Sequence, residues 1–275
     1  MSISRIKNLI LLILAICALG LMMVVVPQRL TQDRQQRQVL AELKTLYASY
    51  DLSLDLAKLP GSARLYSVEL SGADALAAAR SLLGQDAAVV GSEDRYETEY
   101  TAAGGVLRVT RNGGFHAELS DGDAVRDREK EVLRLLRTLG YPANELQPAR
   151  RGEDQSVTIR AEQKLLGVPI FGGALDFVFR ADVLEQIDGT FYMGGESPTR
   201  VSQTQCISCA DALTQLLASR DALGWVGSRV LSAEQGYLPT ETASASVRFV
   251  PTWYIETDTG SFYVNGVTRE VRPSS

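Results

Sequence analysis

The sequence is poor in the side chains that carry metal-dependent and nucleophilic catalysis. Its 275 residues include one histidine and three cysteines. A single histidine excludes a zinc site built from several histidines, and no Gly-x-Ser-x-Gly segment is present to supply a serine nucleophile. A phosphate-binding glycine loop ending in Lys-Ser or Lys-Thr is also missing. We therefore predict a chain that is not an enzyme and that has no catalytic, cofactor-binding or metal-binding residue.

Excess positive charge is lacking as well. The chain carries 28 Lys and Arg residues against 33 Asp and Glu residues, which gives a formal net charge of −5 at pH 7. Such a chain repels phosphate backbones, so binding to nucleic acid would require a local basic stripe. The one small basic cluster flanks the apolar run near the N-terminus. We predict that nucleic acid is not a partner.

That apolar run, Leu9–Val26, contains no charged residue. As a helix it would be about 27 Å long, close to the hydrocarbon thickness of about 30 Å. A cleaved secretory signal is the weaker alternative, because the small-residue site Ala18-Leu19-Gly20 is followed by further apolar residues, and lipidation at Cys17 is weaker still. We expect an uncleaved transmembrane helix and a short tail within residues 1–27.

The rest of the chain is expected to contain a juxtamembrane helix and two domains. Residues 28–50 have amphipathic helical spacing and predict a stalk that is either solvated or in contact with a partner. Three helix-like windows follow, each ended by glycine, with alternating strand-like segments between them: Ala73–Leu83, Ala124–Leu139 and Ala210–Leu223.

We predict an α+β fold from this pattern, with one N-terminal transmembrane helix followed by two antiparallel-sheet domains. Short hairpins between successive strands favour antiparallel pairing, and each sheet would bury one face against helices. The first domain is expected over residues 51–145. The second is expected over residues 146–275, which include a C-terminal hairpin.

Cys206-Ile207-Ser208-Cys209 is the sharpest chemical signal. A two-residue gap brings two sulfurs within reach of each other or of one metal ion. Ser208 and Asp211 predict a capping box, so a helix should begin at this point. Cys206 and Cys209 can form a local disulfide or remain free thiols, and redox activity or an intermolecular metal site are the alternatives.

Other candidates favour structural roles. His116 is predicted to occupy a solvated strand position, and Asp123 is predicted to cap a helix. Trp225 and Trp253 are expected to be core or interface anchors.

The segment from Val247 to Gly266 resembles the closing hairpin of YycI-type proteins, the membrane-anchored regulators of the essential cell-wall sensor kinase of Gram-positive bacteria. Ser4-Arg5-Ile6-Lys7-Asn8-Leu9 is similar to the opening of that family, and Gly172-Gly173-Ala174-Leu175-Asp176-Phe177 is similar to its middle strand. The closing hairpin also resembles PepSY modules. Cys206 and Cys209 match no pattern of the YycI-type family.

The YycI-type resemblance implies an accessory regulator of a sensor histidine kinase that also associates with a YycH-type paralogue. The N-terminus would be cytoplasmic and the large domain extracytoplasmic. Close packing of helices in lipid favours small residues, which makes Ala15, Ala18 and Gly20 the candidate contacts with the kinase. The alternatives are a PepSY-like extracytoplasmic module that binds a cell-envelope protein or restrains a peptidase, and an anchored thiol oxidoreductase.

Overall fold

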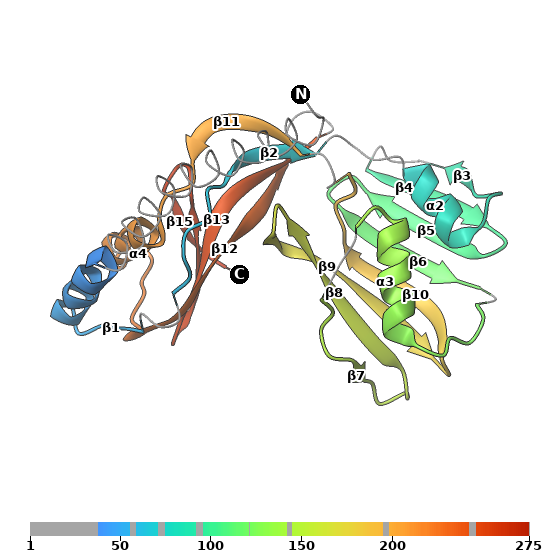
Figure 1. The fold of residues 1–275 in the computed structure, drawn as a ribbon, viewed down its shortest axis with the longest axis horizontal. Helices are drawn as coiled ribbons and strands as arrows, with labels where there is room; N and C mark the ends of the chain where they lie inside the picture. The colour runs from blue at the N-terminus through green and yellow to red at the C-terminus, as the bar shows by residue number, and fades with distance from the viewer. Residues whose placement is uncertain are drawn as a thin grey trace, which may run out of the picture.

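The described part of the protein is mostly β-strand. Within these residues strands make up 47% and helices 20%, and all the strands belong to one mixed sheet (Figure 1). The computed structural model describes residues 38–55, 59–70, 75–91, 96–120, 122–141, 145–194, 198–241 and 246–274.

The predicted α+β class with two separate antiparallel sheets is therefore wrong. Two strand pairs are parallel, and one of them joins strands from the two halves of the chain. Alternating hydrophobic residues identify a strand, but they do not show which other strand it pairs with. The error in the prediction therefore concerns the pairing of the strands.

The transmembrane helix is also not supported. Among the residues that the structure describes, no helix is both long and apolar enough to cross a bilayer. The predicted span Leu9–Val26 and the contact candidates Ala15, Ala18 and Gly20 lie outside the described residues.

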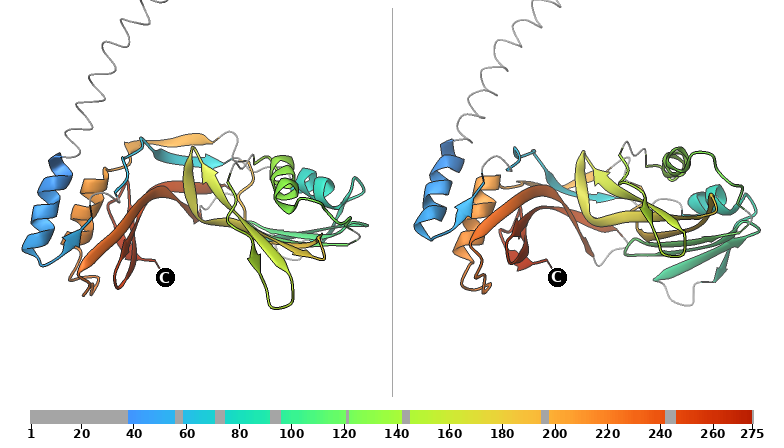
Figure 2. Two further views of the ribbon diagram at one scale, coloured as in Figure 1. Left: turned by 60° about the horizontal axis from the view of Figure 1, so that its bottom comes forward. Right: turned by 90° about the horizontal axis from the view of Figure 1, so that it is seen from below.

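The middle of the chain forms a unit that we call the inserted lobe, residues 75–194. Its strands pair antiparallel in the order β3-β4-β5-β6-β10-β9-β8-β7. Helices α2 and α3 pack on one face of this sheet (Figure 2). Its elements are α2 (Ala75–Leu83), β3 (Ala88–Gly91), β4 (Glu97–Ala102), β5 (Gly105–Thr110), β6 (Gly114–Leu119), α3 (Arg128–Thr138), β7 (Arg150–Arg151), β8 (Val157–Leu165), β9 (Val168–Arg180) and β10 (Val183–Thr190).

Both flanking segments form the terminal lobe, residues 38–70 and 198–274. A helix covers residues 38–49. The other elements are β1 (Ser53–Leu54), β2 (Tyr66–Leu70), β11 (Thr199–Gln205), α4 (Cys209–Ala218), β12 (Arg229–Glu241), β13 (Val247–Thr257), β14 (Gly260–Asn265) and β15 (Val271–Pro273).

Strand β13 lies at the centre of the terminal lobe. It pairs with β12 along one side, and on the other side first with β2 as far as Phe249 and then with β14 from Thr252. Pro251, which has no N–H to donate, lies between these two partners. The predicted hairpin through Asp258 and Gly260 is present between β13 and β14.

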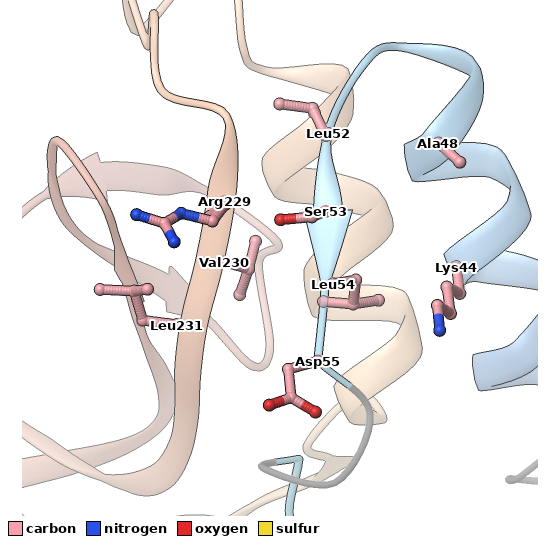
Figure 3. Close-up of a pocket in the computed structure, with 9 residues that line it drawn as sticks. All are labelled: Lys44, Ala48, Leu52, Ser53, Leu54, Asp55, Arg229, Val230 and Leu231. Atoms are coloured by element: carbon pink, nitrogen blue, oxygen red, sulfur yellow. The ribbon is translucent and has the colours of Figure 1, made fainter.

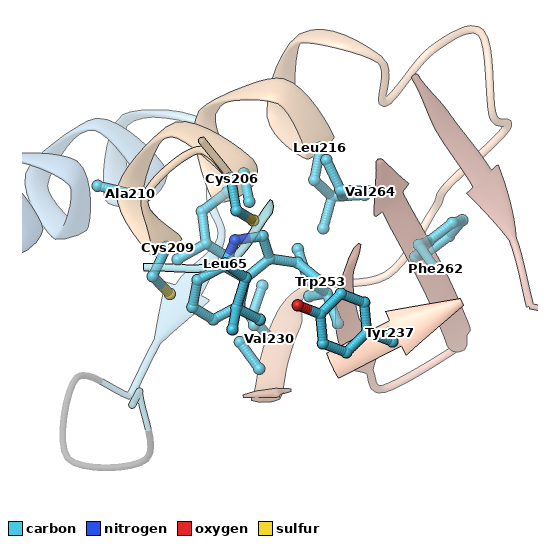
Figure 4. Packing of buried hydrophobic residues seen from close by; sticks show 14 of the residues in the cluster. Leu65, Cys206, Cys209, Ala210, Leu216, Val230, Tyr237, Trp253, Phe262 and Val264 are labelled. Atoms are coloured by element: carbon cyan, nitrogen blue, oxygen red, sulfur yellow. The ribbon is translucent and has the colours of Figure 1, made fainter. Parts of the chain in front are cut away.

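Each lobe has its own hydrophobic cluster. The terminal-lobe cluster joins Leu43 and Leu70 to residues as distant as Val264 (Figure 4). The inserted-lobe cluster runs from Ala78 to Phe191. The predicted boundary between residues 145 and 146 lies inside the segment that builds this second cluster.

The helix over residues 38–49 belongs to the terminal lobe and does not stand free as a stalk. Tyr47 is fully buried, and its hydroxyl donates a hydrogen bond of 2.7 Å to the carbonyl oxygen of Leu213 in α4. Burial raises the pKa of Tyr47 far above its usual range. Within the predicted range of residues 28–50, the structure describes a helix over residues 38–49, and residues 28–37 lie outside the described part of the chain. Leu43 and Tyr47 of this helix pack in one cluster with residues of α4.

The helix starts follow side-chain caps. The capping box predicted from Ser208 and Asp211 is confirmed at the start of α4. The cap of α3 is Asp127, whose carboxylate accepts from the N–H of Lys130, so the assignment of this role to Asp123 is wrong. Both caps satisfy N–H groups that have no partner within the helix.

The two lobes meet where β9 reaches β12. Ile170 of β9 and Tyr237 of β12 form a parallel pair. Next to it, the ring of Phe171 lies 5.8 Å from that of Tyr254 and 5.5 Å from that of Tyr263. Gly236 makes room for this contact, because a Cβ there would come within 2.6 Å of Phe171.

Candidate binding face

The inserted lobe has one sheet face that no described helix covers. The face toward α2 and α3 carries alternate apolar residues such as Tyr100, Leu107 and Phe177, which are buried. The residues between them point to the opposite face, because side chains alternate along a strand. The helices lie on one side of this sheet in both views of Figure 2.

Six charged or titratable residues form a continuous line across that open face, which we call the charged row. Each member is the direct cross-strand partner of the next, so all six side chains lie on one face. In order across β4, β5, β6, β10, β9 and β8 they are Glu99, Arg108, His116, Asp188, Asp176 and Arg160.

Ion pairs connect the members at both ends of the row. Arg108 Nε lies 2.8 Å from a carboxylate oxygen of Glu99, and Arg160 Nη1 lies 2.8 Å from one of Asp176. The hydrogen bond that Arg108 donates to Glu99 raises the pKa of Arg108. Asp188 and Asp176 are direct partners of like charge, an arrangement that costs stability unless a cation lies beside it.

His116 supplies the titratable group at the middle of the row. Its Nδ1 lies 3.2 Å from Asp188 and its Nε2 lies 3.1 Å from Glu118. The hydrogen bond with Glu118, followed by that with Asp188, raises the pKa of His116 above its usual value. The position is partly solvated, as predicted, but the ring takes part in an ionic cluster that the spacing along one strand did not reveal.

Folding stability alone does not account for the row. Its ion pairs are a third to a half exposed, and pairs in such positions contribute little to stability. Their partly exposed charges remain accessible to a second protein. The row is therefore suited to oriented electrostatic contact with another molecule.

Cys206 and Cys209 lie in the core of the terminal lobe, and both are free and buried (Figure 4). The backbone N–H of Cys209 donates to the hydroxyl of Ser62 at 3.0 Å. Burial raises the pKa of Cys206 and raises that of Cys209 to about 12. Protonated, enclosed thiols are poor nucleophiles, so this environment does not favour the thiol oxidoreductase alternative.

A pocket of about 500 Å³ lies between the helix over residues 38–49 and the β1–β12 pair (Figure 3). Its charged lining residues are Lys44, Asp55 and Arg229, and most of the remainder is apolar. Lys44 comes from the helix and Arg229 from the start of β12, so the pocket lies where three elements meet. It contains no member of the charged row.

The two tryptophans belong to the core cluster of the terminal lobe. Trp225 and Trp253 are both buried, as predicted for core anchors, and the indole N–H of Trp253 donates to the carbonyl oxygen of Ile207 at 3.0 Å. In the part of the chain that is described, no three His, Cys, Asp or Glu side chains are grouped so that they could hold a metal ion.

Two distant structural resemblances are among those found by comparison with known proteins. No protein family matches the sequence, and no curated protein matches it. An uncharacterized protein from Eubacterium rectale ATCC 33656 is 10% identical, with a TM-score of 0.46, over 82% of this chain and 90% of its own. The Bacillus megaterium YpeB C-terminal domain is 12% identical, with a TM-score of 0.36, over 72% of this chain and 95% of its own. At these TM-scores neither resemblance assigns a function, and neither points to YycI-type proteins.

Sequence reasoning missed the charged row because its two halves are joined by the pairing of His116 with Asp188, which lie far apart in the chain. Arg108 and Arg160 each lie between apolar neighbours, as any half-buried strand residue does. Only the strand order brings them into one line. The signal available in the sequence was the charged residue in the middle of each strand. Such a residue indicates that one face of its strand is solvated, but it does not show that the charged residues of neighbouring strands form one line.

Proposed function

We propose that this protein is a PepSY-like extracytoplasmic binding module that holds or restrains another protein through the open face of the inserted lobe. The observation that carries the proposal is the charged row, which places carboxylates and guanidinium groups in register across six strands. Function by surface contact requires no reactive group, only a rigid and oriented set of charges.

The shape of the inserted lobe supports this function. Helices α2 and α3 pack against one side of the sheet and make the strands rigid, so the opposite side presents its charges in a fixed geometry. A preorganised charged surface loses little conformational freedom on binding. A peptidase or a cell-envelope protein with a complementary pattern of charges is the expected class of partner.

Site-specific photo-cross-linking in the producing cells tests the proposal. A photoreactive residue at Gln186, which lies on the open face beside the row, should form an adduct with one partner protein. The same residue at Lys130 on α3 should not form it, and the adduct at Gln186 should disappear in the Asp188→Asn variant. An adduct that forms equally at Lys130, or that persists in Asp188→Asn, would show that the charged row does not bind the partner.

A further inference from the structure

Strand β3 is the least protected edge of the large sheet. It pairs with β4 on one side, and on the other side no described strand pairs with it. All four of its residues are exposed, and Val89 and Val90 are 53% and 65% exposed. Tyr96, just before β4, is 71% exposed. A strand edge with unpaired backbone groups and bare apolar side chains is a template for another strand.

Three other free edges of the described sheet carry features that discourage pairing. Strand β7 consists of Arg150 and Arg151, and β15 contains Arg272 and Pro273. Strand β11 is mainly polar. Charged residues and proline are the usual means of protecting an edge, and β3 has neither.

A side chain placed beside β3 can reach two carboxylates. Gly91 is the direct partner of Glu99 on β4, and a Cβ at Gly91 would meet no atom within 4 Å. A long side chain from an added strand can therefore lie across Gly91 toward Glu99 and Glu97. Glu97 is 50% exposed and lies 3.9 Å from Arg108, so it retains capacity for a second cation.

These features distinguish between two possible occupants. A second copy of β3 would bring Ala-Val-Val-Gly, which has no basic side chain for Glu97 and Glu99. The β3–β4 register also shifts between Val89 and Gly91, which leaves Val90 without a partner on β4. Two such irregular strands cannot pair flat along their full length, whereas a separate extended segment can adjust to one of them.

We propose that β3 binds an extended segment of another protein by strand addition, and that this segment alternates β-branched apolar residues with arginine or lysine. The backbone of the segment pairs with the free edge of β3. Its apolar side chains cover Val89 and Val90, and a basic side chain crosses Gly91 to Glu97 and Glu99. This surface is the edge of the sheet and shares only Glu99 with the charged row, so a strand added here goes beyond the function proposed above.

Fluorescence anisotropy with a defined peptide tests this proposal on the full chain in a non-ionic detergent. The probe is labelled Ser-Val-Arg-Val-Arg-Val-Ser. A peptide with glutamate in place of both arginines tests the charge, and one with proline as its central residue tests the backbone pairing. The first peptide should bind, and each of the other two should bind at least tenfold more weakly.

Two variants of the chain locate the site. Val90→Lys should weaken binding of the first peptide at least tenfold, because it places a cation on the edge. Val201→Lys, at an exposed valine of β11 on another edge, should leave binding unchanged. Equal unfolding midpoints will show that both variants fold. Equal binding of the arginine and glutamate peptides, unchanged binding by Val90→Lys, or a dimer of the chain that Val90→Lys abolishes without peptide binding would each overturn the proposal.

Discussion

Gln163 and Tyr192 are joined by two hydrogen bonds at the place where the inserted lobe meets the terminal lobe. The side-chain amide of Gln163 donates to the carbonyl oxygen of Tyr192 at 2.7 Å, and the N–H of Tyr192 donates to the Gln163 side-chain oxygen at 2.9 Å. Gln163 is 3% exposed. Tyr192 lies just beyond the end of β10, and the Gln163 side chain bonds to its backbone as a neighbouring strand would.

Replacing Gln163 should therefore cost more stability than replacing an exposed glutamine. Gln163→Ala leaves a buried N–H and a buried C=O without partners, and we expect the free energy of unfolding to fall by about 2 to 3 kcal/mol. Denaturant unfolding measures this loss. Gln147→Ala, which removes an exposed side-chain bond to Glu162, is the matched control and should change stability by less than about 0.5 kcal/mol. Equal losses in the two variants would contradict the structural role of Gln163.

Cys209 should be almost unreactive in the folded protein. Its pKa is raised to about 12 by burial, so at pH 8 the thiol remains protonated and enclosed. In a Cys17→Ser background, alkylation by iodoacetamide should be at least about 100-fold slower in the native protein than in urea. Mass spectrometry of timed samples measures the two rates. Fast labelling of the native protein, or mixed disulfides with client proteins, would revive the redox alternative.

His116 should titrate above its usual value of 6.5. The chain has one histidine, so a single imidazole signal in a proton NMR titration reports its pKa directly. The Glu118→Gln variant should lower that pKa, because the hydrogen bond that the imidazolium donates to the Glu118 carboxylate is the main cause of the increase. A value at or below 6.5 would mean that the contacts with Glu118 and Asp188 are not formed in solution.

The same shift predicts how stability changes with pH. A raised pKa means that the folded state binds the proton more tightly, so the contribution of His116 is fully present below the unfolded value near 6.5. It is lost as the pH rises through the folded value. The stability difference between the wild type and His116→Gln should therefore decrease between pH 5.5 and pH 8 in urea unfolding. A stability difference that grows with pH would contradict a raised pKa of His116 in the folded protein.

Local structure was largely readable from the sequence. The alternating segments become β5, β6, β8 and β14 within a residue or two, and the capping box correctly marks the start of α4. These features depend on spacing along a few neighbouring residues, such as the alternation through Val106 and Leu107. Side-chain periodicity and caps act over that short range, which is why they were predictable.

The pairing of strands that lie far apart in the chain could not be predicted in this way. β2 pairs with β13, and β9 pairs with β12, across long stretches of chain. No periodicity encodes the pairing of Val68 with Phe249 or of Ile170 with Tyr237. The charged row depends on one such pairing, that of β6 with β10, which places His116 beside Asp188. Its other pairings join successive strands, so the continuous row was recognised only in the three-dimensional fold.

The central claim is that the charged row binds a partner protein, and affinity measurements on its members test it most directly. With the partner captured from Gln186, isothermal titration should show that Arg160→Gln and Asp188→Asn each weaken binding at least tenfold. Glu129→Gln, an exposed charge on α3, should leave the dissociation constant unchanged. Unchanged affinity in both row variants, or an equal loss in Glu129→Gln, would contradict the account.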